Sequence, residues 1–75
     1  MGRLPVVSGK ETIRALEKAG FVRARQAGSH VVLQKPLPGT TVTVVVPDHP
    51  ELATGTLRAI IRKSGLSVDE FVSFL

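Results

Sequence analysis

The chain has 75 residues, and a chain of this length forms one domain around a single small core. It contains no cysteine, which excludes disulfides and thiolate metal sites. Ten basic and six acidic side chains give a net charge of +4, which favours a polyanionic partner such as a nucleic acid or an acidic protein. No apolar run is long enough to span a membrane and no secretory signal is evident, so we expect a single cytoplasmic domain over residues 1–75.

The first half of the chain opens with a predicted helix. Ser8-Gly9-Lys10-Glu11 has the capping-box pattern, in which the first and last side chains each accept from the other residue's backbone N–H. Gly20 can end the helix in the left-handed conformation, so we place the helix at about residues 9–19. Its buried stripe is expected to be Ile13, Leu16 and Ala19.

Three strands are predicted next, over Phe21–Gln26, His30–Lys35 and Thr41–Val46. Ala27–Ser29 is a predicted turn. Pro36–Thr40 is a predicted loop, because its two prolines cannot donate to a strand ladder.

Two further helices close the chain. Thr54 or Thr56 is the predicted cap of the first, and Gly65 its end. Ser67–Glu70 is a second capping box and predicts a short last helix. The order α-β-β-β-α-α predicts an α+β fold, a three-stranded antiparallel meander with helices on one face. The helical residues expected to be buried are Leu57, Ile60, Ile61, Phe71, Val72 and Leu75.

The alternation of side chains along the strands predicts which residues face away from the helices. The inward set is expected to be Val22, Ala24, Val31, Leu33, Val42, Val44 and Val46. The uncovered face would then carry Arg23, Arg25, His30 and Gln34 together.

His30 is the foremost candidate for chemistry. Imidazole exchanges a proton near neutral pH, and the preceding Gly28 and Ser29 suit a tight turn that a phosphate can approach. His49 lies between Asp48 and Pro50, and we interpret it as a loop residue. A metal site would need both histidines plus Asp48 or Glu51, and no dense ligand spacing favours one.

Several segments together resemble the HicA-type mRNA interferase toxins. They are Leu4–Glu11, Leu16–Phe21, Gly28-Ser29-His30, Gly55–Arg62 and Gly65–Phe71. The resemblance implies a fold like a double-stranded-RNA-binding domain and ribosome-independent cleavage of mRNA. It also implies a HicB-type antitoxin that blocks the site. The family's catalytic histidine is the one in the Gly-Ser-His element, here His30.

The resulting hypothesis is a toxin that acts as an endoribonuclease without metal or cofactor, with His30 as the base for the ribose 2′-hydroxyl. The alternatives are a non-catalytic RNA-binding module on the same fold and a protein-interaction domain with an acidic partner. The RNA preference and the oligomeric state are left open. The residues expected to bind RNA are Lys10, Arg23, Arg25, Gly28, Ser29 and Lys35.

Overall fold

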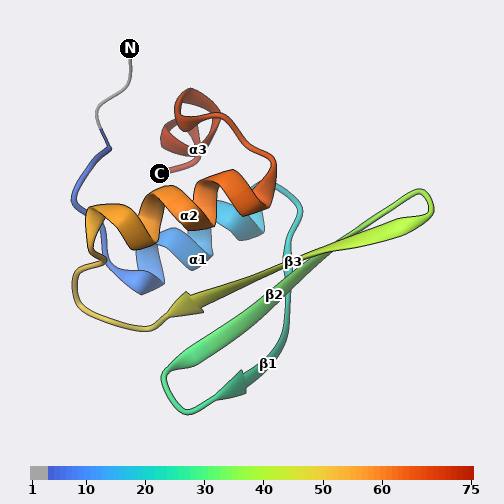
Figure 1. Cartoon of the computed structure of the whole chain (residues 1–75), viewed down its shortest axis with the longest axis horizontal. Helices are drawn as coiled ribbons and strands as arrows, with labels where there is room; N and C mark the ends of the chain where they lie inside the picture. The colour runs from blue at the N-terminus through green and yellow to red at the C-terminus, as the bar shows by residue number, and fades with distance from the viewer. Residues whose placement is uncertain (1–3) are drawn as a thin grey trace.

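The computed structural model describes residues 4–75, which form three helices and a three-stranded sheet (Figure 1). The order of elements confirms the predicted α+β fold. Among residues 4–75, no helix has the length and hydropathy that crossing a bilayer requires. The elements are α1 (Gly9–Lys18), β1 (Val22–Ala27), β2 (His30–Leu37), β3 (Thr40–Pro47), α2 (Thr54–Ser64) and α3 (Val68–Ser73).

Capping boxes start α1 and α3, as predicted. The Ser8 N–H donates to the Glu11 carboxylate at 2.8 Å, and the Glu11 N–H donates to the Ser8 hydroxyl at 3.0 Å. Ser67 and Glu70 form the same pair of bonds at 2.8 and 3.0 Å. Each box satisfies backbone donors that have no partner within the helix, so both helices begin where the sequence indicates.

The start of α2 differs from the prediction, because neither Thr54 nor Thr56 caps it. The cap position is Ala53, whose side chain offers no acceptor, and Thr54 is already helical. The position is set from outside the helix: the Leu52 N–H donates to the Val7 carbonyl at 2.9 Å, and the Leu52 side chain is buried. A tertiary contact therefore overrides the local capping preference at this end.

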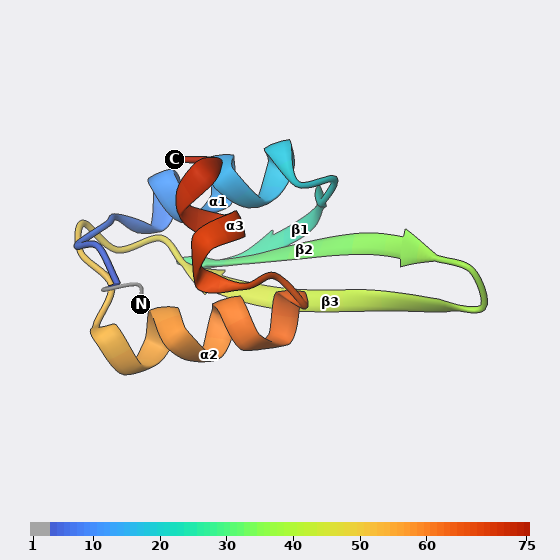
Figure 2. The same ribbon diagram turned by 90° about the horizontal axis from the view of Figure 1, so that it is seen from above.

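The sheet is an antiparallel meander with β2 between β1 and β3, and its second hairpin is longer than predicted. Pro36 lies inside β2, opposite Thr41 of β3, and only residues 38–39 form the turn. Pairing of β1 with β2 ends at Val22 and Gln34, so β2 has no neighbour on that side at Pro36. A strand tolerates proline where no partner awaits its N–H. The hairpin extends beyond the helices (Figure 2).

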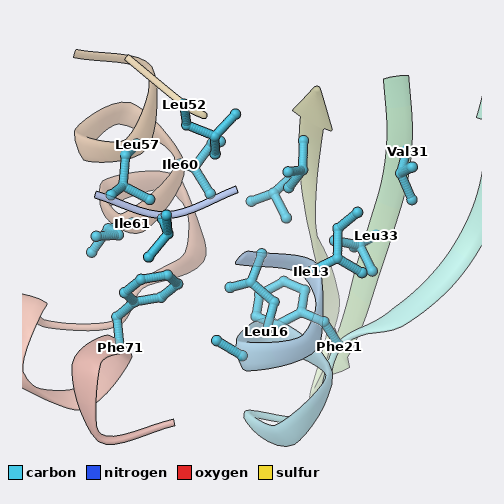
Figure 3. Packing of buried hydrophobic residues seen from close by; sticks show 14 residues of the cluster. Ile13, Leu16, Phe21, Val31, Leu33, Leu52, Leu57, Ile60, Ile61 and Phe71 are labelled. Atoms are coloured by element: carbon cyan, nitrogen blue, oxygen red, sulfur yellow. The ribbon is translucent and has the colours of Figure 1, made fainter. Parts of the chain in front are cut away.

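One hydrophobic cluster joins the helices to the covered face of the sheet (Figure 3). The inward set predicted for β2 and β3 is confirmed for Val31, Leu33, Val44 and Val46, which are at most 2% exposed, while Val42 is half-buried. The other members are Val7, Ile13, Ala15, Leu16, Phe21, Leu52, Leu57, Ile60, Ile61 and Phe71.

The C-terminal helix buries fewer side chains than predicted. Phe71 is fully buried, but Val72 and Leu75 are 41% and 46% exposed. Val68 and Phe74 pack against the core instead. A helix of six residues presents one narrow face to its neighbours. Here this face consists of Val68, Phe71 and Phe74, which are spaced three residues apart.

Candidate functional site

His30 is the first residue of β2 and is exposed. It follows the tight turn between β1 and β2, where Gly28 has a φ of +59°, a conformation that favours glycine. The Gln26 side-chain amide donates to the Gly28 carbonyl at 3.0 Å, and the Asp48 N–H donates to the Ser29 carbonyl at 2.6 Å. These two bonds fix the turn, so the backbone that carries the imidazole has a defined position.

The open face of the sheet carries His30, as predicted. Val31 and Leu33 on the same strand are 1% and 0% exposed, so alternation directs His30 to the opposite side. Across the strands His30 pairs with Pro47 of β3 and with Ala27 of β1.

The end of β3 opposite His30 is held by the start of α1. The Gly9 N–H donates to the His49 carbonyl at 2.8 Å. A side chain at Gly9 would collide with the Pro47 carbonyl, so only glycine permits this approach. The strand that faces His30 is thereby anchored to a helix.

The predicted orientation of β1 is wrong for Arg23, which lies on the helix-covered side. Arg23 pairs with Leu33, a core residue, and its Nε lies 3.7 Å from a carboxylate oxygen of Glu17 on α1. Arg25 pairs with Val32 and shares the open face with His30, as predicted.

A β-bulge between Arg23 and Arg25 causes this difference. The extra residue, Ala24, puts the two halves of the strand out of step, so simple alternation fails across it. Val22, predicted to be inward, is paired with the outward-facing Gln34 and is 58% exposed. Ala24 is exposed as well, although it was predicted to be buried.

The two lysines predicted to bind RNA lie outside the groove that His30 lines. The Lys35 ammonium donates to the Ala19 carbonyl at 2.8 Å, next to the end of α1, and lies 5.8 Å from the centre of the Phe21 ring. Lys10 lines a small pocket with Asp48 and His49. The structure thus groups His30 with Gly28, Ser29 and Arg25, and places Arg23 and Lys35 on the other side of the sheet.

A groove of about 560 Å³ opens beside His30, between β3 and α2. α2 runs alongside β3 in the opposite direction (Figure 2). No acidic side chain is among the lining residues within the described part of the chain, 4–75. The wall formed by the sheet includes His30, Thr43, Val45 and Pro47, and the wall formed by the helix includes Gly55, Thr56, Ala59, Ile60 and Lys63.

Two features make the groove electropositive. Lys63 places an ammonium group in its lining. The first turn of α2 also lines it, at Gly55 and Thr56, and no side chain caps the backbone N–H groups of that turn. A helix N-terminus carries partial positive charge, which adds to that of the lysine.

Lys63 and Thr56 were missed as candidate site residues. They share a stripe with Ala59 and Ile60, at helical spacings of three, four and seven. This stripe beside the buried one was a usable signal on α2. Whether this stripe lies next to His30 depends on how α2 packs against β3. The sequence pattern does not specify that packing.

Metal-ligand types do not gather in the part of the chain that the structure describes, residues 4–75. No group of three or more histidine, cysteine, aspartate or glutamate side chains lies close enough together to hold an ion. His30 lines the groove beside α2, whereas His49 lines the separate pocket at the start of α1. The groove thus presents an exposed imidazole and an ammonium, which together can bind an anion and exchange a proton.

A comparison with protein families identifies a matching family. A family model described as the HicA toxin of bacterial toxin–antitoxin systems matches residues 9–66. This span runs from the start of α1 to just beyond α2, and it includes both His30 and Lys63. A search of curated proteins returned no match.

Proposed function

The chain belongs to the HicA toxin family of bacterial toxin–antitoxin systems, and on this premise we propose that it is an endoribonuclease that cleaves mRNA with His30. The observation that carries the proposal is the position of His30, exposed on the open face at a groove that offers positive charge without any acidic lining residue among residues 4–75. RNA is an anionic substrate, and a cytoplasmic enzyme of this kind would meet mRNA directly.

The proposed reaction uses the nucleophile that RNA itself supplies. His30 removes the proton of a ribose 2′-hydroxyl, and the 2′-oxygen attacks the adjacent phosphorus atom. The bond from phosphorus to the 5′-oxygen breaks, leaving a 2′,3′-cyclic phosphate. The departing oxygen takes up the proton that the imidazole had accepted. One side chain thus serves as base and then as acid, with no metal or cofactor in the scheme.

Phosphate binding is assigned to the predicted residues that share the face of His30. Arg25 supplies a guanidinium on the neighbouring strand, and the turn at Gly28 and Ser29 supplies backbone next to the imidazole. Positive charge held near the phosphate stabilises the transition state because it needs no reorganisation during the reaction.

The decisive experiment compares the two histidines. His30→Ala is expected to slow RNA cleavage by about 10²–10⁴-fold, the usual contribution of a positioned proton-transfer group. The exposed side chain contributes little packing, so thermal unfolding should be unchanged. His49→Ala is the matched control, because His49 is also exposed but lies in another pocket. Cleavage by His30→Ala at the wild-type rate would refute the proposal.

Addition of EDTA separates this mechanism from one that uses a metal. Because proton transfer is assigned to His30 alone, the cleavage rate should be the same with and without the chelator. Strong inhibition that zinc or magnesium reverses would contradict the metal-independent scheme.

One observation favours a second candidate, a non-catalytic RNA-binding module. Within residues 4–75, the groove lining contains no carboxylate and no second imidazole that could act as a separate acid. A single-histidine enzyme should therefore be slow, and a module that only binds would have the same charges. Incubation with RNA and analysis of the ends distinguishes them: 2′,3′-cyclic phosphate ends indicate cleavage, and intact RNA indicates binding alone.

Family membership implies an antitoxin partner, and we assign that role to a HicB-type protein that covers the face bearing His30. Such a partner would hide the imidazole and Arg25 from RNA. Addition of the antitoxin should stop cleavage, and RNA cleavage at full rate within the complex would contradict this assignment.

A further inference from the structure

The groove beside His30 has two kinds of surface. Val45, Ala59 and Ile60 give it apolar walls, and Val45 is 46% exposed although it is a large hydrophobic side chain. His30 and Lys63 give it polar groups. A ligand that fits must combine a flat or compact apolar body with negative charge.

The polar groups lie toward opposite ends of the groove. α2 runs antiparallel to β3 (Figure 2). Thr56, near the start of α2, therefore lies toward the end of the groove at Pro47, the partner of His30, and Lys63 lies toward Thr43. From Thr56 to Lys63 the helix rises by about 10 Å. From Pro47 to Thr43 the strand spans about 13 Å. A short stretch of single-stranded RNA covers this distance.

Three other pockets within residues 4–75 do not combine these features. The pocket of Lys10 includes Asp48, and the pocket of Arg14 and Lys18 includes Glu11, so an acidic side chain opposes the cations in both. The pocket between Arg58 and Arg62 has no imidazole in its lining. Of these four pockets, the groove alone has in its lining both an imidazole and a cation with no acidic residue opposite.

We propose that this groove takes up one unpaired nucleotide of the RNA next to the cleaved bond, and that Lys63 binds the phosphate beyond it. The proposal rests on the function assigned to His30 and specifies its substrate as single-stranded RNA. The base packs against Val45, Ala59 and Ile60, and the scissile phosphate lies at His30. A base within a duplex exposes only its edge and cannot enter between β3 and α2, so paired RNA is excluded from the site.

Binding of an RNA that cannot be cleaved tests the groove separately from catalysis. The probe is a short 2′-O-methyl RNA, which lacks the nucleophile, measured alone and annealed to its complement. Wild-type protein should bind the single strand more tightly than the duplex. Lys63→Gln should weaken single-strand binding several-fold and reduce the slope of log affinity against log salt concentration by about 0.7, the value for one phosphate.

Two further variants complete the design. Ala59→Leu fills the groove from an exposed helix position, and it should weaken single-strand binding at least as much as Lys63→Gln, with unchanged thermal unfolding. Lys18→Gln is the control for charge, because Lys18 is exposed on α1 outside the groove. It should bind like the wild type.

The outcomes distinguish the groove from the chemistry. Equal binding of duplex and single strand would overturn the proposal, as would Ala59→Leu and Lys63→Gln proteins that bind like Lys18→Gln. No binding of the single strand at all would also overturn the proposal. The occupant of the groove would then be a protein segment and not RNA. If the wild-type protein cleaves no RNA but binds the single strand in a way that depends on Lys63 and Ala59, the enzymatic function is refuted. The assignment of the groove to single-stranded RNA is then supported.

Discussion

The two faces of the sheet use their charged residues differently. On the helix-covered side, Lys35 donates to the end of α1 and Arg23 lies close to Glu17. On the open side, His30 and Arg25 are exposed. The basic residues of β1 and β2 are thus divided between stabilising the fold and presenting charge to a ligand.

This division separates residues that neighbour one another in sequence. Arg23 and Arg25 are two positions apart, and strict alternation would put them on one face, yet the bulge directs them to opposite faces. A cluster of basic residues in a sequence therefore does not define a binding surface, because pairing register decides which side each charge occupies. Substitutions on the two faces should have different consequences.

Lys35→Met should have the largest effect on folding among the charged residues of the covered side. Methionine keeps the length and apolar body of lysine but removes the donor to the Ala19 carbonyl. Loss of a charged hydrogen bond in a half-buried setting should lower the free energy of unfolding by about 1 to 2 kcal/mol. For a domain of this size the melting temperature should fall by about 5 to 10 °C.

The control for this change is Lys18→Met. Lys18 is exposed on α1, so the same replacement there should shift the melting temperature much less. Equal shifts of the melting temperature in the two variants would show that the contact between Lys35 and Ala19 adds nothing to stability. The proposed difference between the two faces of the sheet would then be contradicted.

Arg25→Gln and Arg23→Gln sharpen the comparison within a single strand. Arg25 shares the face of His30, so its replacement should weaken RNA binding several-fold and reduce the salt slope by about 0.7. Arg23→Gln should cause a smaller loss, because its side chain lies on the other side of the sheet. Fluorescence titration of the same RNA at several salt concentrations measures both. A larger loss for Arg23→Gln would place the RNA on the covered face.

Local signals in the sequence predicted most of the fold. Ser8 and Ser67 cap the helices they were expected to cap, and Gly65 ends α2 with a φ of +81°. The inward valines of β3 follow from period-two alternation. These features succeed because each depends on residues within a few positions. The predicted start of α2 was wrong because a tertiary contact with Val7 sets it. The predicted end of β2 was wrong because the proline is tolerated where β1 no longer pairs with β2.

The candidate site was less accessible to prediction than the fold. His30 and the turn before it form a local element, so sequence reasoning located them. The bulge at Ala24 leaves no mark in composition, and it moved Arg23 to the covered face. Lys63 reaches the groove only because α2 packs beside β3, a packing angle that periodicity does not encode. Pairing register and helix packing were thus the missing information.

The smallest expected effect concerns Glu70, on the covered side near Lys35. Hydrogen bonds from the Ser67 backbone N–H and hydroxyl, with a lesser contribution from the positive charge of Lys35, hold the pKa of the Glu70 carboxyl below its usual value of 4.5. A lowered pKa in the folded state means that the ionised carboxylate stabilises the protein above the unfolded-state pKa. This contribution is lost as the pH falls through the folded-state value.

Glu70→Gln should therefore destabilise the domain slightly at neutral pH and hardly at all in strong acid, because the wild type has lost its carboxylate there. Urea unfolding of both proteins between neutral pH and strong acid measures the difference. Since the carboxylate is fully solvated, salt should reduce the Lys35 contribution while leaving the contribution from Ser67 largely intact. A difference between the two proteins that grows toward acid has the wrong sign for a lowered pKa. It would show that the capping box at α3 does not favour the ionised carboxylate.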